Sequence, residues 1–326
     1  MVFAAARRLI GSTYRKFALD PEVAADAQIA AADFLGRKDG IFSGWTDLSV
    51  EASDFGQKII YPEESTPHPD YSKPLIADVI GYSKVKRIDI KKAERMQGVL
   101  EMQRILKQKA RGPMIGGFCF GPLGVLGMMR GTEHLFRDCL RYPDKVKTGL
   151  DIISDVLAEY VAAQCDNGAC MITLDTLYAS WAGLSKRLWE EIEGPFVKKL
   201  SGIIRSKGRM VGVHNCGQGA YFDSQIKYMK PDNISFAYLP DDCSSPSELK
   251  RKYGHKVTLT GYVSTALLMH GTPFDVTREC NRIIKELAHG GNFVLAPQCE
   301  FPPDAPLENA IAMVKAARYC PETLSD

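Results

Sequence analysis

Two cysteines and a histidine lie directly after short apolar runs of this sequence. His214 and Cys216 follow the run Val-Gly-Val, and Cys299 follows the run Phe-Val-Leu-Ala-Pro-Gln. Thiolates and imidazoles are common zinc ligands, and a zinc ion with three protein ligands keeps a fourth position open for a substrate or water. These residue types therefore predict a catalytic zinc site made of His214, Cys216 and Cys299.

Each of the three residues has a simpler interpretation when it is taken alone. A histidine at a strand end commonly bonds to a backbone carbonyl, and a free cysteine commonly packs as a small apolar side chain. His-x-Cys is a weak motif by itself. The zinc hypothesis depends on its combination with Cys299, which lies between Pro297 and Pro302.

Carboxylates follow apolar runs in the same way. Asp175 ends the run Ile-Thr-Leu, Asp47 and Glu51 follow the first apolar run, and Glu300 directly follows Cys299. We expect Asp175 and Asp47 to be catalytic carboxylates of the same pocket. Alternatively, Asp175 caps a helix or binds loop amides. Glu51 is either a fourth zinc contact in a resting state or a residue of a helix surface.

The elements that must position these residues alternate along the chain. Short apolar runs bounded by Gly, Pro or Asp are typical of buried parallel strands, and we expect them at 39–44, 114–120, 170–175, 210–214, 234–239, 257–263 and 292–297. Apolar residues at helical spacing predict helices at 21–35, 93–111, 142–168, 184–207, 274–289 and 305–317. This order predicts a parallel sheet covered by helices.

The expected fold is α/β, a (β/α)8 TIM barrel that forms one catalytic domain over residues 1–326. Seven strands are one fewer than this barrel needs, so we expect the first strand to be missing from this chain or to come from residues 82–88. An open Rossmann-like sheet is the competing architecture, although no Gly-x-Gly-x-x-Gly follows a first strand. Catalytic residues of TIM barrels lie at the carboxyl ends of the strands, where the three zinc-ligand candidates are expected.

The composition excludes several classes of protein. The 326 residues are 45% hydrophobic and 25% charged, with a net charge of +2, so nothing indicates nucleic-acid or membrane-surface binding. No apolar run approaches the roughly 20 residues that span a bilayer, and the first ten residues lack the apolar core of a signal peptide. Nine irregularly spaced cysteines favour reduced thiols in a cytoplasmic enzyme.

Segments along most of the chain resemble the uroporphyrinogen decarboxylase superfamily. The resemblance is closer to its zinc-dependent branch, the methylcobamide:coenzyme M methyltransferases. It is carried by residues 47–56, 117–123, 172–175 with 179–180, 213–217, 261–264 with 271–273, and 295–309. In that branch the His and Cys of His-x-Cys-Gly bind zinc, and the last segment carries the third zinc ligand.

The resemblance implies a zinc-dependent methyltransferase. A zinc-bound thiolate, from coenzyme M or another small thiol, would take a methyl group from a methylcobamide on a separate corrinoid protein. This chain has no Asp-x-His-x-x-Gly motif for binding cobalamin itself. The alternative on the same scaffold is a zinc-dependent demethylase, which would pass a methyl group from methanol or a methyl ether to a Co(I) corrinoid protein.

Two further alternatives involve no metal. One is a uroporphyrinogen-type decarboxylase, and the other is a barrel that binds a corrinoid protein or tetrapyrrole without turnover. The decarboxylases carry an Arg-Gln-x-Gly-Arg segment that grips substrate carboxylates, and this chain lacks it, although Arg7, Arg8 and Arg15 lie near its start. Decarboxylation is therefore disfavoured.

Overall fold

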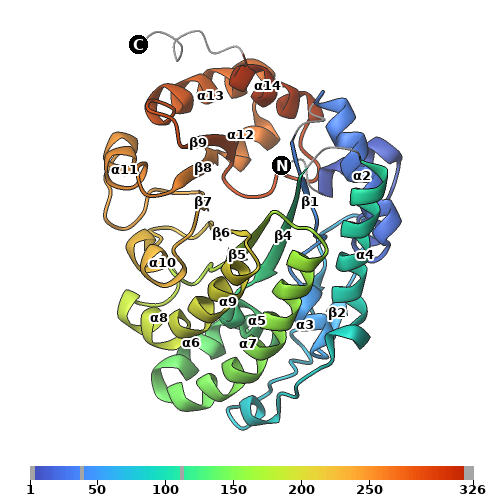
Figure 1. Cartoon of the computed structure of the whole chain (residues 1–326), viewed down its shortest axis with the longest axis vertical. Coiled ribbons are helices and arrows are strands. Elements are labelled where there is room, and N and C mark those ends of the chain that lie inside the picture. The colour runs from blue at the N-terminus through green and yellow to red at the C-terminus, as the bar shows by residue number, and fades with distance from the viewer. Residues whose placement is uncertain (1–3, 37–39, 111–113, 319–326) are drawn as a thin grey trace.

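Seven parallel strands form the large sheet of the protein, and helices surround it (Figure 1). The computed structural model describes residues 4–36, 40–110 and 114–318. In spatial order the strands are β1 (Ile41–Ser43), β4 (Met114–Phe120), β5 (Met171–Asp175), β6 (Met210–Asn215), β7 (Asn233–Phe236), β8 (Thr258–Val263) and β9 (Phe293–Pro297). Because this order follows the sequence, each connection leads to the adjacent strand, as it does in a TIM barrel.

The connections are mostly helical. Before β4 lie α1 (Tyr14–Leu19), α2 (Pro21–Phe34), α3 (Val50–Asp54), α4 (Glu94–Lys109) and the antiparallel pair β2 (Ile59–Ile60) and β3 (His68–Pro69). After it come α5 (Pro122–Arg130), α6 (Thr132–Arg141), α7 (Pro143–Asp166), α8 (Lys186–Ile192), α9 (Gly194–Ser206), α10 (Phe222–Met229), α11 (Pro246–Tyr253), α12 (Thr265–His270), α13 (Pro273–Leu287) and α14 (Leu307–Arg318). Among the helices that the structure describes, none is long and apolar enough to cross a membrane.

The fold is TIM-barrel-like with one strand missing, and the expected α/β class is confirmed. Among the described residues no strand joins β9 to β1. The 3₁₀ helix η1 (Ala4–Ile10) lies at this open side, where the Ala4 amide donates to Glu300 Oε1, 2.7 Å away and just after β9. The same 3₁₀ helix packs on α2, which contacts β1.

Three details of the expected elements are wrong. Residues 82–88 supply no strand, because they form the end of the 3₁₀ helix η2 (Gly81–Lys84) and an irregular segment. The expected helix 184–207 is two helices, because Pro195, which has no amide hydrogen, lies in the first turn of α9. The strand expected at 234–239 ends at Phe236. Residues 39 and 111 of the expected elements lie outside the described residues.

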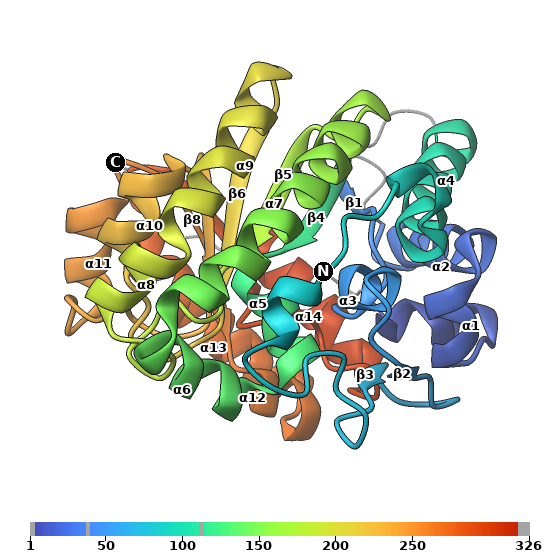
Figure 2. The same ribbon diagram turned by 90° about the horizontal axis from the view of Figure 1, so that it is seen from below.

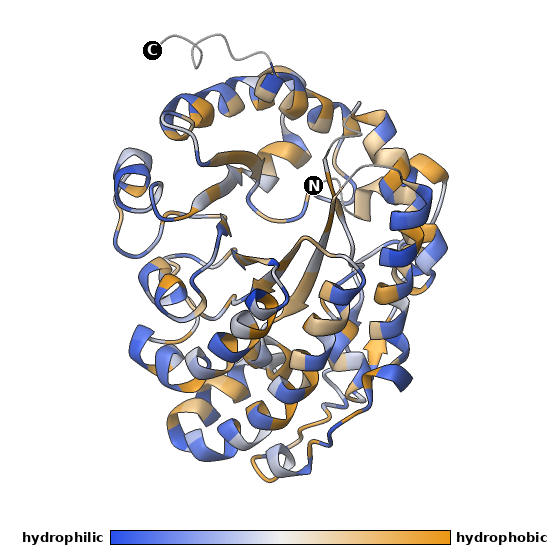
Figure 3. Cartoon of the chain, in the orientation of Figure 1, coloured by the Kyte–Doolittle hydropathy of each residue, from blue (hydrophilic) through white to orange (hydrophobic). Residues whose placement is uncertain are grey.

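Side chains alternate between the two faces of each strand. Val211 and Val213 of β6 are fully buried, and they alternate with Gly212 and His214, which share the other face. Figure 3 shows apolar colour along the strands and mixed colour on the surrounding helices. Viewed at 90°, the long strands β4, β5 and β6 run side by side between the helices (Figure 2). This alternation directs His214 away from the surrounding helices.

Candidate metal centre

Three polar side chains form a row across neighbouring strands. Asp175 on β5 pairs in register with His214 on β6, and His214 pairs with Ser235 on β7. Residues in register on parallel strands point to the same face of the sheet. The row therefore places a carboxylate and a hydroxyl on either side of the imidazole, at the carboxyl ends of the strands.

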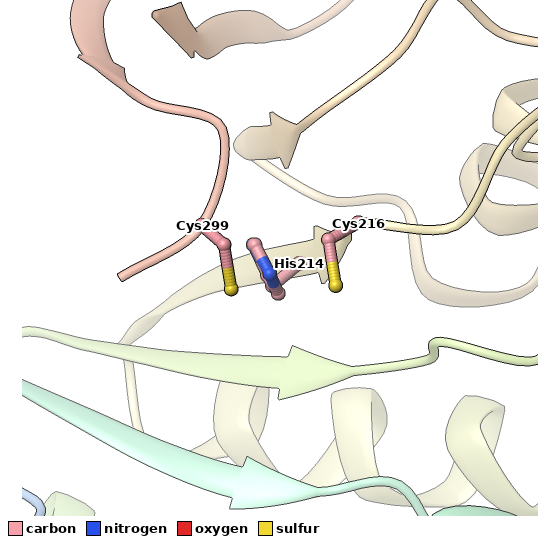
Figure 4. Close-up of side chains that lie close together, drawn as sticks. All are labelled: His214, Cys216 and Cys299. Atoms are coloured by element: carbon pink, nitrogen blue, oxygen red, sulfur yellow. The ribbon is translucent and has the colours of Figure 1, made fainter. Parts of the chain in front are cut away.

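His214, Cys216 and Cys299 come together, as the sequence predicts. One ligand atom from each residue lies within 4.8 Å of the other two, so the group could hold a metal ion. In Figure 4 the two sulfur atoms lie on either side of the His214 ring, with Cys299 coming from the loop after β9. Two thiolates on one tetrahedral zinc ion would lie about 3.8 Å apart, given Zn–S bonds of about 2.3 Å. This spacing falls inside the 4.8 Å within which the three ligand atoms lie.

Ser235 orients the imidazole. Its Oγ lies 3.1 Å from His214 Nδ1, and Ser235 is buried with 7% of its surface exposed. In the tautomer that carries its hydrogen on Nδ1, the ring can donate to Ser235 Oγ and keep the lone pair of Nε2 for a cation. The hydrogen bond therefore fits the histidine to a metal-binding role.

Asn215 holds the turn that carries Cys216. Its Nδ2 donates to the carbonyl oxygens of Thr176 (2.8 Å) and Ala179 (3.1 Å), and its Oδ1 accepts from the Gly217 amide (2.8 Å). A Cβ at Gly217 would lie 2.5 Å from Ser180 Oγ, so only glycine fits this close approach. The fixed turn brings the Cys216 thiol back beside His214.

The loop that carries Cys299 is fixed from two sides. The Gln298 amide donates to Val263 O and its Nε2 donates to Ala237 O, both at 2.9 Å. Glu300 accepts from the Ala4 amide, and burial raises the pKa of Glu300 to about 8. The loop is therefore tied both to the neighbouring strand ends and to the first helix of the chain.

The local charges suit a cation. Hydrogen bonds from Cys216 and His214 lower the pKa of Cys299 below its ordinary value, so the pair of sulfurs favours holding a thiolate, the form that binds metals. Burial raises the pKa of Asp175 to about 6, although the nearby His214 acts in the opposite direction. Asp175 Oδ1 is buried and has no hydrogen-bond partner, which marks it as free to interact with a bound molecule.

The donor group is also accessible. His214 and Cys216 are half-buried, whereas Cys299 is exposed. A structural zinc site is closed by four protein ligands, but a catalytic one leaves a position open. The three donors and their exposure fit the catalytic kind of site.

Asp47 and Glu51 are engaged elsewhere. Asp47 forms a buried ion pair with Arg95 and accepts from Ser49, so its catalytic role stays a prediction without a supporting contact. Glu51 is 2% exposed, which makes the surface interpretation wrong, and its Oε1 accepts from the Phe120 amide at 3.0 Å. Within the described residues, the cluster of possible metal ligands does not include Glu51.

Sequence reasoning missed Ser235, Asn215 and Gln298 as residues that position the ligands. Only Ser235 had a usable signal. Neighbouring parallel strands end at a common edge, so aligning the ends of the predicted strands 210–214 and 234–239 could have indicated a residue beside His214. The second strand was predicted to end at residue 239, three residues after its observed end at Phe236, so this alignment would not have selected Ser235. Asn215 and Gln298 act through loop geometry, which no spacing in the sequence reveals.

Comparisons with known proteins agree on a family. A family model described as "Uroporphyrinogen decarboxylase (URO-D)" matches residues 1–319. The chain is similar to "Methylcobamide:CoM methyltransferase MtaA" from Methanosarcina barkeri (strain Fusaro / DSM 804), with 25% identity over 70% of this chain and 65% of the relative. It thus spans less than two thirds of that relative's length. It is also 29% identical to a uroporphyrinogen decarboxylase from Methylobacillus flagellatus over 57% of this chain and 52% of that protein.

Solved structures support the fold. A "methyltransferase from Methanosarcina mazei" superposes with a TM-score of 0.79 at 20% identity, over 98% of this chain and 91% of that one. A B12-independent methionine synthase from Shewanella sp. W3-18-1 gives a TM-score of 0.55 at 14% identity, over 90% of this chain and 87% of that one. Both likenesses concern the fold alone.

Proposed function

This chain belongs to the uroporphyrinogen decarboxylase family, and we propose that it is a zinc-dependent methyltransferase that moves a methyl group from a methylcobamide to a small thiol. The observation that carries the proposal is the group of donor atoms from His214, Cys216 and Cys299, which lie within 4.8 Å of one another. The similarity to a methylcobamide:CoM methyltransferase supports the choice of donor and acceptor. We place the corrinoid on a separate protein.

His214, Cys216 and Cys299 would hold the zinc ion. Bound zinc lowers the pKa of a thiol at its open position, so that the reactive thiolate dominates at neutral pH. Ser235 holds the imidazole in the orientation that ligation needs. These residues would therefore position the acceptor sulfur at the barrel mouth.

Asp175 would take the proton of the incoming thiol at its unpartnered Oδ1. The sulfur then forms a bond to the methyl carbon as the cobalt–carbon bond breaks, and the bonding electron pair stays on cobalt as Co(I). Since the thiol loses one proton and cobalt gains the pair, charge and atoms balance without an added oxidant or reductant.

The donor set favours this reaction over metal-free decarboxylation. Arg7, a candidate for gripping substrate carboxylates, is 2% exposed and pairs with Glu64 (3.4 Å) and Asp304 (3.2 Å). It is therefore occupied by protein carboxylates. The three-donor cluster has no role in a metal-free decarboxylase.

Metal analysis combined with a methyl-transfer assay tests the proposal. The purified protein is assayed for zinc, and the conversion of methylcobalamin to cob(I)alamin is followed with a panel of thiols that includes coenzyme M, before and after chelation. We expect about one zinc per chain and thiol-dependent conversion that chelation abolishes and zinc restores. Conversion of a methyl ether or methanol with Co(I), and none with thiols, would instead support the demethylase.

A further inference from the structure

A cavity of about 460 Å³ lies at the mouth of the barrel, among the segments that follow the strands. Gln218 and Gln298 are part of its wall. Gln218 is two residues after Cys216, and Gln298 directly precedes Cys299, so two residues of the wall are close in sequence to the two cysteines. The rest of the wall comes from the loops after β5, β6 and β7 and from β8. The cavity and the donor cluster therefore lie at the same end of the barrel.

Trp181 forms an aromatic wall of the cavity. Its backbone amide donates to Gly219 O at 3.2 Å, next to an antiparallel bridge between Ser180 and Ala220. The indole lies so close to Gly219 that a Cβ there would fall 1.4 Å from the ring. Trp181 is 62% exposed, so much of the indole surface faces outward.

Two tyrosines extend this wall. Tyr262 stacks on Phe236 with ring centroids 5.3 Å apart and planes 29° apart. Tyr238 lines the same cavity and is 43% exposed. The faces of aromatic rings attract cations, and Trp is the strongest of the three aromatic side chains in this respect.

The charge of the cavity has one sign. Among the described residues, Asp241 is the only charged residue that lines it. Carboxylate oxygens of Asp223 and Asp242 lie within 4.8 Å of that of Asp241. Lys186 contacts Asp223 (2.5 Å) and Asp241 (3.7 Å), and Lys252 contacts Asp242 (2.6 Å). Three carboxylates against two ammonium groups leave an excess of one negative charge beside the aromatic wall.

We propose that this cavity selects an acceptor thiol that carries a positive charge, a short aminothiol. This inference rests on the proposed function. The ammonium lies against Trp181, Tyr238 and Tyr262 with Asp241 as its counter-ion, while the sulfur reaches the donor cluster. A sulfonate in the same place would meet a carboxylate and no cationic wall residue.

The reaction of the aminothiol balances in the same way as before. The carbon–sulfur bond forms as the cobalt–carbon bond breaks, the electron pair remains on cobalt, and the thiol proton leaves through Asp175. The ammonium group is unchanged. It contributes only binding energy and orientation.

A binding experiment tests the cavity without turnover. Zinc-loaded protein is titrated calorimetrically with three methyl thioethers of equal chain length, which end in an ammonium, a hydroxyl or a sulfonate. We expect the ammonium compound to bind about tenfold more tightly than the hydroxyl compound, and the sulfonate compound to bind most weakly. Equal affinities, or the reverse order, would overturn the proposal.

Substitutions in the cavity wall test whether the preference for the ammonium compound arises there. Asp241→Asn and Trp181→Leu should each remove most of the preference for the ammonium compound. Asp166→Asn is the matched control, because it removes the same charge from an exposed residue at the end of α7, far from the cavity wall. A preference that survives both cavity substitutions would contradict the assignment of the binding site.

The corresponding thiols then test turnover with methylcobalamin. Methyl transfer without a charge preference in binding would leave the proposed function intact and overturn the cavity inference. A charge preference without methyl transfer to any thiol would support the cavity as a binding site and contradict the proposed function.

Discussion

Ser235 Oγ lies 3.1 Å from His214 Nδ1, on the strand next to the one that carries the histidine. We predict that Ser235→Ala lowers zinc affinity roughly 10- to 100-fold, because the imidazole loses the partner that sets its orientation and tautomer. Competition with a chromogenic chelator measures this affinity. Ser235→Thr keeps the hydroxyl and should retain most of it; equal loss in both variants would indicate a packing defect instead.

Cys299→Ala should remove most of the zinc with little effect on folding, because Cys299 is exposed and in a loop. Zinc content per chain and the thermal unfolding midpoint are measured together. Cys170→Ala is the control, since Cys170 is half-buried and precedes β5 at the opposite end of the barrel. Stoichiometric zinc in the Cys299 variant would remove this residue from the site.

Asp175→Asn should reduce the rate of methyl transfer by about 10²-fold while zinc content stays near that of the unmodified protein. The amide keeps the shape of the side chain but cannot take a proton from a thiol. Single-turnover kinetics with methylcobalamin give the rate, and metal analysis gives the zinc content. An unchanged rate would return Asp175 to the role of a partner for loop amides.

Glu51→Gln should flatten the dependence of stability on pH. Burial raises the pKa of Glu51 from 4.5 to about 8, so in this window the folded protein holds a proton that the unfolded chain has released. The free energy of unfolding therefore falls as the pH rises from about 4.5 to 8, by about 1.4 kcal/mol per pH unit from this residue alone. Glutamine mimics the protonated acid and should remove that slope.

Urea unfolding at several pH values between 5 and 8, each compared between the two proteins, measures the effect of Glu51. Contributions from other titrating groups cancel in the difference. Parallel stability curves for the two proteins would mean that Glu51 is ionised in the folded state.

Gly219→Ala should displace Trp181, because the new methyl group would occupy the position of the indole ring. Gly208→Ala is the matched control: Gly208 has φ +68° against +63° for Gly219, but a Cβ at Gly208 meets nothing within 4 Å. Both variants carry the same backbone strain, so only the first should lose affinity for the ammonium thioether. Similar affinities in the two variants would contradict a role for Trp181 in binding.

The sequence alone predicted the strands well because each is a short apolar run that ends at a clear break. It brought His214, Cys216 and Cys299 to one end of the barrel, and the structure places them together. The prediction failed where contacts between elements distant in sequence decide the role of a residue. Glu51 follows a strand as a catalytic carboxylate would, yet it is buried against the Phe120 amide, and this contact depends on how α3 packs beside β4.

Asp47 shows the same limit. Its position after β1 suits a catalytic role, but a cation 48 residues further along the chain, Arg95, neutralises it. An ion pair between residues so far apart leaves no periodic pattern in the sequence. Distances between loops were equally hidden, so the cavity at the mouth of the barrel could not be predicted.

The hydrogen bond between Ala4 and Glu300 joins residues 296 positions apart and lies next to Cys299. Contacts between residues so distant in sequence require the closure of a very long loop, which makes them costly in entropy and late to form. During refolding, the ability to retain zinc should accordingly return after the helical content does. Assembly of the reactive centre thereby reports that the whole chain has reached its final arrangement.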